Sequence, residues 1–282
     1  MVLFDNHNHS QFSFDGKRTS VEESSRAAVA AGLGGICFSD HNDFYVPEST
    51  MDKSKLCGVL TDVPAQQQEI DRVQSLLPGL KILKGIEIGM HQKSHEVIRQ
   101  SLEEHSFDQV IASVHYVDET DPFFGDYYEG KDWKEAYGHY LETIYREMTW
   151  LKDFDIMGHF DYIVRYASYE KDSILYRDFS DILDAMFKYL IQEGKALEIN
   201  TKSYQDFHGR KPVLEIQGDG RRDNQFRLRF PRSIQSRTGL QEICRNDPVI
   251  WFQMDGTLRK QEADTASFIK QKESRSGFFL LF

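Results

Sequence analysis

The stretch Asp5-Asn6-His7-Asn8-His9-Ser10 decides the fold of this chain and suggests its chemistry. It follows the short apolar run Val2-Leu3-Phe4, which is typical of a buried strand. Alternate side chains of an extended segment point to the same side, so His7 and His9 are expected to aim at one point just past the strand. Two imidazoles placed in this way suit one metal ion. Taken alone, the pair is equally compatible with two surface histidines near the start of the chain.

Strand-like and helix-like segments alternate from the first residues to residue 200. Apolar runs predict further strands at residues 35–39, 81–88, 109–115, 156–161 and 196–200. Helical patterns are expected around residues 63–77, 95–104, 133–151 and 179–193. An earlier helix begins at Ser20-Val21-Glu22-Glu23, which has the form of a capping box. This alternation predicts an α/β protein in which helices cover a parallel sheet.

Polar residues stand at or near the carboxyl ends of the successive predicted strands. They are His7 and His9, Asp40 and His41, Glu87, His115, and His159 and Asp161. In a barrel of parallel strands these ends meet on one face. Imidazoles and carboxylates without thiolates suit zinc, manganese or iron. So large a set suggests more than one ion, with Glu87 and Asp15 available as bridges. Clustered divalent ions activate water for the hydrolysis of phosphate esters, so the pattern predicts metal-assisted hydrolysis.

The composition argues against several other classes of protein. A formal net charge of -11 disfavours a nucleic-acid-binding surface, which needs a basic stripe. The three cysteines form no CxxC pair and are expected to be reduced thiols in the cytoplasm. No apolar run has the length of a membrane span or the form of a secretory signal. The remaining histidines are expected to be exposed and without function: His91, His95, His105, His139 and His208.

Several motifs together resemble the polymerase-and-histidinol-phosphatase (PHP) superfamily. They are Asp5-x-His7-x-His9-Ser10-x-x-Ser13-x-Asp15, Ser39-Asp40-His41, Gly85-x-Glu87-x-Gly89, Ser113-Val114-His115-Tyr116 and Gly158-His159-x-Asp161-x-x-x-Arg165-Tyr166. Asp15 and the last motif look most like the monofunctional histidinol-phosphatase branch. The resemblance implies a distorted, TIM-like (β/α)7 barrel with a cluster of up to three divalent metal ions. It also implies hydrolysis of L-histidinol phosphate to L-histidinol and phosphate in histidine biosynthesis.

The resemblance assigns roles to individual residues. The implied metal ligands are His7, His9, Asp15, His41, Glu87, His115 and His159, with Glu87 as the bridge. Asp40 is expected to orient a ligand imidazole, or else only to cap its strand. Arg165 is expected to bind the substrate phosphate, and a surface salt bridge is the equal alternative. The acidic loop with Asp118, Glu119 and Asp121 either attracts the amine of a phosphorylated amino-alcohol substrate or is solvated, which we favour.

Two other functions are compatible with the sequence. A PHP phosphoesterase could act on another small phosphate ester or on a nucleotide. The chain could also be an inactive barrel remnant, because the seventh strand of the family ends in Gly-Ser-Asp-x-His and this sequence contains no such motif. Neither the oligomeric state nor the identity of the metal follows from the sequence.

The sequence changes character after about residue 216. Residues 1–204 contain seven arginines, whereas residues 205–245 contain eight arginines and one lysine. When residues 217–232 are back-translated and read one base later, the degenerate codons permit an apolar strand followed by Gly-Ser-Asp-Ser-His. This match suggests a one-base slip of the reading frame near residue 217.

The slip predicts how the chain is organised. Residues 1–216 form the phosphoesterase domain, and residues 217–282 form an atypical tail that is out of frame. The last barrel strand is then missing or disrupted, which exposes a sheet edge and apolar surface. The chain of 282 residues is therefore expected to be poorly soluble, or much less active than a chain with the frame restored.

Overall fold

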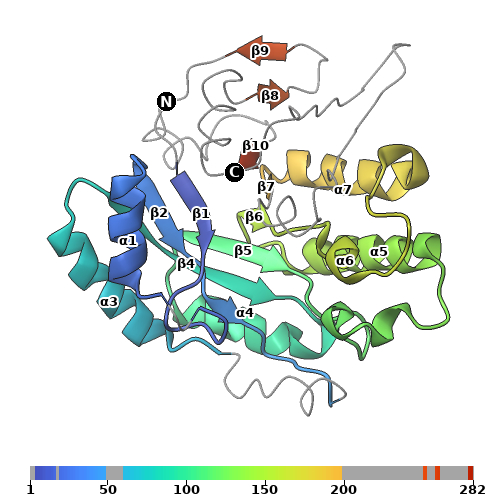
Figure 1. The fold of residues 1–282 in the computed structure, drawn as a ribbon, viewed down its shortest axis with the longest axis horizontal. Coiled ribbons are helices and arrows are strands. Elements are labelled where there is room, and N and C mark those ends of the chain that lie inside the picture. Colours follow the sequence, from blue (N-terminus) through green and yellow to red (C-terminus); the bar gives the residue numbers. More distant parts are fainter. Residues whose placement is uncertain are drawn as a thin grey trace. The chain divides into compact units, whose positions relative to one another are not determined.

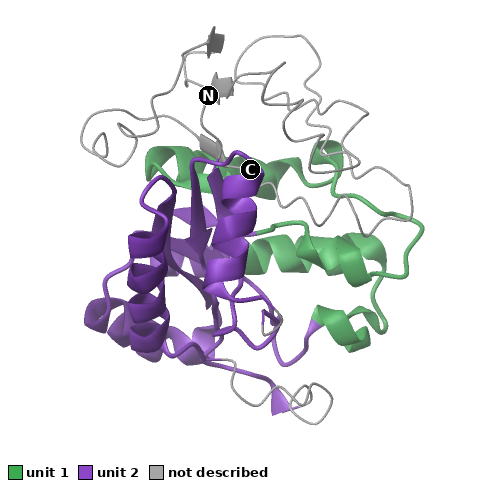
Figure 2. Cartoon of the chain, turned by 60° about the vertical axis from the view of Figure 1, so that its left-hand side comes forward, with its two compact units in different colours: residues 1, 122–145, 159–281 green, residues 2–121, 146–158, 282 purple. Residues whose placement is uncertain are grey.

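The structure, a computed structural model, describes residues 4–16, 19–48 and 60–198, together with the backbone of three short strands between residues 250 and 281. The chain divides into two compact units, which Figure 2 shows in different colours. Unit 2 comprises residues 2–121 and 146–158, and unit 1 comprises residues 122–145 and 159–281. All of the predicted metal ligands except His159 therefore belong to unit 2.

Unit 2 contains a parallel sheet whose strands follow one another in chain order (Figure 1). The order is β1 (Phe4–Asn8), β2 (Gly35–Phe38), β4 (Lys81–Gly89), β5 (Gln109–Ser113) and β6 (Ile156–Met157). Each neighbouring pair is parallel, and β3 (His41–Asn42) also pairs in parallel with β4. β4 is buried along most of its length, as expected for a central strand covered on both faces. The predicted parallel sheet is confirmed.

Three helices of unit 2 are α1 (Val21–Ala30), α3 (Val63–Leu76) and α4 (His95–Glu104). α1 begins at the predicted capping box. There the Glu23 N–H donates to Ser20 Oγ at 3.1 Å, and the Ser20 N–H donates to Glu23 Oε2 at 3.0 Å. At the start of α3, the Asp62 side chain accepts a hydrogen bond from the Ala65 N–H at 3.1 Å. These caps satisfy N–H groups that the first turn of a helix leaves unpaired.

A hydrophobic core lies between α1, α3 and the sheet. Its buried members are Val21, Ala28, Ile36, Phe38, Ile70, Val73, Leu80 and Ile82. Ile36 and Phe38 are two apart in β2, so they share one face of the strand, and Ile70 and Val73 are three apart in α3, so they share one face of the helix. α1 and α3 lie side by side over that face of the sheet (Figure 1). The core thus fixes β2 and β4, which lead to Asp40 and carry Glu87.

Unit 1 contains α6 (Tyr162–Tyr166), α7 (Ser180–Gln192), β7 (Ala196–Glu198) and the short 3-10 helices η2 (Pro122–Phe124), η3 (Asp126–Tyr128) and η4 (Tyr176–Asp178). α5 (Trp133–Leu151) begins in unit 1 and ends in unit 2. β10 (Phe279–Leu281) pairs in parallel with β7, and β8 (Ile250–Phe252) pairs antiparallel with β9 (Leu258–Lys260). β10 has the sequence Phe-Leu-Leu, so it does not carry the Asp-x-His pair of the family's seventh strand.

β5 ends at Ser113 rather than at residue 115, and β1 and β6 also end differently from the prediction. β1 continues to Asn8, so His7 lies within the strand rather than past it. β6 ends at Met157, and the chain turns at residues 160–161, where the Tyr162 N–H donates to His159 O at 2.9 Å. This turn leads into α6, which the sequence did not predict because five residues are too few to show a helical period. The predicted strand end at residues 199–200 and the tail motifs of residues 217–232 lie outside the described residues.

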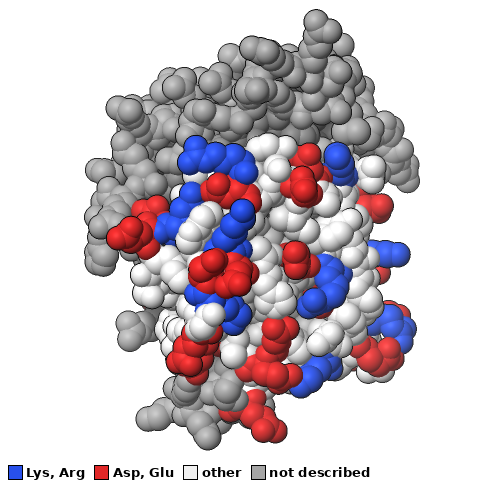
Figure 3. Space-filling view, turned by 90° about the vertical axis from the view of Figure 1, so that its right-hand side faces the viewer, with Lys and Arg blue, Asp and Glu red and all other residues white. Residues whose placement is uncertain are grey.

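Charges of both signs are mixed on one face of the protein, which Figure 3 shows. On the face in Figure 3, Lys and Arg side chains are interspersed with Asp and Glu side chains. Arg72 pairs with Glu22 and with Glu69 at 2.8 Å each, and Arg99 pairs with Glu96 at 2.6 Å. None of the helices in the described part of the chain has the length and apolar character needed to span a bilayer.

Candidate metal centre

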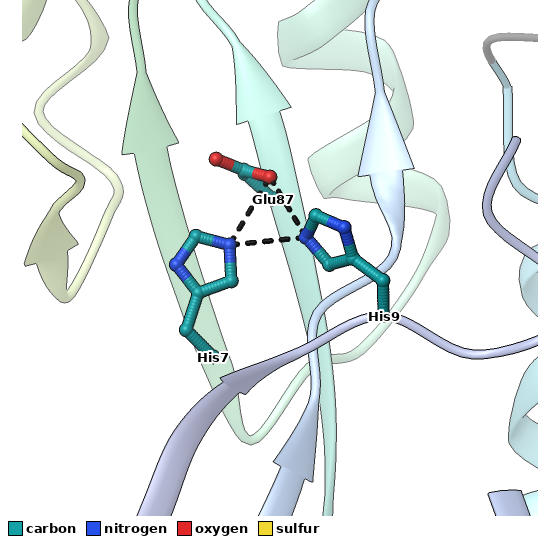
Figure 4. Close-up of side chains that lie close together, drawn as sticks. All are labelled: His7, His9 and Glu87. Atoms are coloured by element: carbon teal, nitrogen blue, oxygen red, sulfur yellow. Dashed lines mark hydrogen bonds and ion pairs between the residues drawn. The ribbon is translucent and has the colours of Figure 1, made fainter. Parts of the chain in front are cut away.

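Glu87 lies at the centre of a group of histidines in unit 2. It belongs to β4, and its side chain is fully buried. His7 in β1 and His9 just after it point their Nε2 atoms at Glu87 Oε2 over 3.2 and 3.1 Å (Figure 4). The two Nε2 atoms are 3.1 Å apart. The spacing of two residues therefore aims both imidazoles at one point, as the sequence predicts.

A second group forms where the loop after β1 meets the segment that follows β2. Asp15 lies 2.9 Å from His9 Nδ1 and 3.6 Å from His41 Nε2. Ser13 Oγ donates to Asp15 Oδ1 at 2.7 Å and orients the carboxylate. His41 Nδ1 in turn lies 3.2 Å from Glu87 Oε2. His9 and His41 thus link Asp15 to Glu87.

The third group lies beyond the end of β5. His115 Nε2 is 3.2 Å from Glu87 Oε1, and Ser113 Oγ donates to the same oxygen at 2.6 Å. The other ring nitrogen of His115 lies 2.8 Å from Asp43 Oδ1. Sequence reasoning missed Asp43, whose available signal was its position two residues after His41.

Asp40 joins the loops of the site, and within the described ranges it hydrogen-bonds to no imidazole. Its buried carboxylate accepts from the Ser10 N–H at 2.5 Å, from Ser10 Oγ at 2.8 Å and from Gln66 Nε2 at 2.7 Å. These bonds tie the loop that follows β1 to the end of β2 and to α3. No imidazole is among the hydrogen-bond partners of Asp40 in the described residues, and orientation of a ligand imidazole by Asp40 stays a prediction. Asp43 does hydrogen-bond to an imidazole.

The carboxylates and imidazoles of the cluster stabilise one another's charges. Burial alone would raise the pKa of Glu87, but the positive charges of nearby imidazoles outweigh burial and hold that pKa well below its usual range. Burial alone would lower the pKa of His41, but Glu87, Asp15 and Asp43 raise it to about 9. The cluster therefore favours positive charge at its centre, which is the condition for binding a divalent cation.

The raised pKa of His41 predicts how the stability of the metal-free protein depends on pH. The ordinary pKa is 6.5 and the folded value is about 9, so protonation stabilises the folded state fully below pH 6.5. This stabilisation, roughly 3 kcal/mol, is lost as the pH rises through 9. We expect the thermal midpoint of chelator-treated protein to fall between these two pH values. Zinc-loaded protein is the control, and an equal fall in its midpoint would contradict the prediction.

The donor set fits divalent metal ions. In unit 2, three groups each bring one ligand atom per residue within 4.8 Å of one another: His7, His9 and Glu87; His9, Asp15 and His41; and His41, Asp43 and His115. Nitrogen and oxygen ligands about 2 Å from one zinc ion lie about 3 Å from one another, which matches the separations around Glu87 Oε2. His41 Nδ1 is buried and has no hydrogen bond of good geometry to a described residue. Because the groups share His9 and His41, the set can serve more than one ion.

Two predicted site residues lie in unit 1. His159 is buried, and its backbone N–H donates to Glu198 Oε2 at 2.7 Å. The side chain of Arg165, in α6, is only 5% exposed and lies 3.9 Å from Asp161. Arg165 is therefore not a surface salt-bridge residue. Metal binding by His159 and phosphate binding by Arg165 stay predictions.

The expectation that the remaining histidines are exposed is wrong for the four that the structure describes, because His91 is buried and His95, His105 and His139 are half-buried; His208 lies outside the described residues. His91 Nε2 lies 2.9 Å from Asp118 O. His95 Nε2 lies 2.6 Å from the buried carboxylate of Glu147, and its ring stacks on Trp150 at 3.4 Å. His91 and His95 connect segments of unit 2, so they contribute to its packing.

The acidic loop after β5 is only partly solvated. Glu119 pairs with Lys93 at 2.5 Å and also accepts a hydrogen bond from the Tyr45 hydroxyl. Asp121 is 9% exposed. A fully solvated loop, the interpretation favoured from the sequence, is therefore wrong for Asp121, and attraction of a substrate amine stays a prediction.

Comparisons with known proteins agree with these observations. The PHP domain model matches residues 5–202. A histidinol-phosphatase of Lactococcus lactis subsp. lactis (strain IL1403) is 35% identical over 211 residues, which are 73% of this chain and 74% of that protein. A crystal structure of histidinol phosphate phosphatase from Lactococcus lactis, complexed with zinc, L-histidinol and phosphate, has a TM-score of 0.63 at 31% identity and covers 73% of this chain and 78% of its own.

A second solved structure, from Listeria monocytogenes, shares the fold with a TM-score of 0.58 at 17% identity and covers 70% of this chain and 82% of its own. These matches confirm the expected α/β fold of the distorted-barrel PHP class. All of the residues in the five quoted motifs fall inside the segment that the family model matches. The chain therefore belongs to the PHP domain family.

Proposed function

We propose that the chain is a metal-dependent phosphatase that hydrolyses L-histidinol phosphate to L-histidinol and phosphate in histidine biosynthesis. One observation carries this proposal: four histidines surround the buried carboxylate of Glu87 in a chain that is 35% identical to a histidinol-phosphatase. Zinc is the metal that we assign first, because the related crystal structure contains it, and the donor set also suits manganese or iron.

The residues of the centre have distinct roles in this proposal. Divalent ions bound there supply the chemistry, since they lower the pKa of water and neutralise charge on phosphate oxygens. Glu87 joins the groups, because its two oxygens face imidazoles that come from separate strand ends. Asp15 holds His9 and His41 in place from the loop after β1. The burial of Glu87 and His115 keeps bulk water away from the carboxylate.

The substrate proposed for this centre is a small phosphorylated amino alcohol. Arg165 is the proposed partner of its phosphate group, because a guanidinium can donate two parallel hydrogen bonds to phosphate oxygens. The formal net charge of -11 supports a small substrate rather than a nucleic acid, which would favour a continuous basic surface. We place the reaction in the cytoplasm, where the buried thiol of Cys37 would stay reduced.

A panel of substrates tests the proposed specificity. Phosphate release is measured for L-histidinol phosphate, phosphotyrosine and a nucleoside monophosphate at equal metal loading. We expect kcat/KM for L-histidinol phosphate to exceed the others by at least about 100-fold. Equal rates on all three would favour a general phosphoesterase, and no hydrolysis by a metal-loaded chain would favour the inactive remnant.

A further inference from the structure

Asp43 is a buried carboxylate whose two oxygens face two different imidazoles. It follows β3 directly and is 2% exposed. Its Oδ1 accepts a hydrogen bond from His115 Nδ1 at 2.8 Å. Its Oδ2 lies 3.4 Å from His41 Nδ1. Both side-chain partners of Asp43 in the described residues are thus histidines of the candidate metal centre.

The approach of Asp43 to His115 depends on a glycine. Gly89 is the last residue of β4, two residues after Glu87. A Cβ atom at Gly89 would overlap the carboxylate of Asp43, with only 2.6 Å to its Cγ, and would lie 3.3 Å from His115 Nδ1. The absence of a side chain at Gly89 therefore creates the space that the carboxylate occupies.

The contacts of Asp43 differ from those of the other buried aspartate nearby. Asp40 uses its oxygens on Ser10 and Gln66, so it stabilises the loops that carry the site. Asp43 faces the rings themselves. An imidazole whose Nδ1–H donates to a carboxylate has its tautomer and ring orientation fixed, and its other nitrogen is left with the free electron pair. For His115 that other nitrogen faces Glu87 Oε1 at 3.2 Å.

We propose that Asp43, in the space left by Gly89, is a positioning residue that holds His115 with Nε2 directed at the metal centre and supports His41 from the same carboxylate. The proposal rests on the metal centre of the proposed function and extends it to a residue outside the predicted ligand set. Asp43 contributes a charge as well as a shape, since an anionic partner makes the opposite ring nitrogen a stronger ligand.

Zinc affinity of the full chain tests this role. Asp43→Asn keeps the shape but removes the charge, and the asparagine amide can also present an N–H group to the ring. We expect the dissociation constant for zinc, measured by competition with a chromophoric chelator, to rise about 10- to 100-fold. The visible absorption spectrum of the cobalt-loaded variant should also change, because it reports the ligands around the ion.

Glu147→Gln is the matched control. Glu147 is 1% exposed and bonds to a histidine, His95, at 2.6 Å, but neither residue belongs to a metal-holding group described above. The control should lower the thermal midpoint of the metal-free protein about as much as Asp43→Asn does, with zinc affinity and the cobalt spectrum unchanged. A second variant, Gly89→Ala, keeps the carboxylate but displaces it, and it should weaken zinc binding in the same direction.

The possible outcomes separate this proposal from the proposed function. If the unmodified chain binds zinc and hydrolyses L-histidinol phosphate while Asp43→Asn keeps full zinc affinity, only the role of Asp43 is wrong. Failure of Asp43→Asn to fold, with normal zinc binding by Gly89→Ala, would make Asp43 a purely structural residue and would also overturn the proposal. If the unmodified chain binds no zinc, both the metal centre and this role are wrong.

Discussion

Replacing Glu87 with glutamine is expected to abolish metal binding and nearly all phosphatase activity. The carboxylate is fully buried, with Oε2 within 3.2 Å of His7, His9 and His41, and Oε1 at 3.2 Å from His115. Glutamine removes the negative charge and turns one acceptor into an N–H donor that faces imidazole nitrogens. Bound metal ions stabilise the transition state by several kcal/mol, and losing this stabilisation corresponds to a fall of about 10³-fold in kcat.

The measurement for Glu87→Gln is metal content by elemental analysis, together with phosphate release from L-histidinol phosphate. Glu147→Gln is again the control, because it neutralises a carboxylate that is equally buried but pairs, among the described histidines, with His95 alone. We expect the control to keep its metal and its kcat. Full metal content in the Glu87 variant would show that Glu87 does not join the groups of the centre.

Restoring the reading frame near residue 217 is expected to produce the second large effect. We propose that the restored chain carries a strand that ends in Gly-Ser-Asp-Ser-His, and that its Asp and His complete the metal set. Support comes from the absence of that motif in the sequence as written and from the family match, which ends at residue 202. The absence of a metal ligand should lower activity at least as much as the loss of a contact that supports a ligand. We therefore expect the chain with the restored frame to be more active than the chain as written by about 100-fold or more.

The comparison needs both versions of the chain and one control. Resequencing the coding DNA across residues 195–240 shows first whether a base is missing or extra. Purified chains in the two frames are then compared in soluble yield, metal content and turnover. A restored chain with alanine in place of the new Asp and His should regain soluble yield but little activity, because the sheet edge is covered while the ligands are absent. Equal stability and turnover in the two frames would contradict the frame proposal.

Strand periodicity explains why much of the centre could be predicted from the sequence. His7 and His9 are two residues apart on an extended segment, and Glu87 and His115 lie at or near the ends of neighbouring parallel strands. The geometry of a parallel sheet brings such positions together whatever the details of the loops. Apolar runs predicted β2 and β4, and the Ser-x-x-Glu pattern at residues 20–23 predicted the capping box of α1.

The remaining parts depend on contacts that no local pattern encodes. Asp43 is one of many acidic residues in loops, and its role becomes visible only when Gly89, distant in sequence, leaves space for it beside His115. His95 reads as a polar residue at the start of a helix, yet it lies against Glu147 from α5. Tertiary partners of this kind decide whether a polar side chain is exposed, and sequence spacing does not report them.

Release of phosphate from L-histidinol phosphate before and after metal removal tests the central claim most directly. The full chain is assayed as purified, after exhaustive chelation, and after zinc is returned in stoichiometric amounts. We predict hydrolysis by the purified chain, loss of hydrolysis on chelation, and recovery when zinc is returned. Hydrolysis that persists in protein shown to be free of metal would contradict a metal-dependent phosphatase.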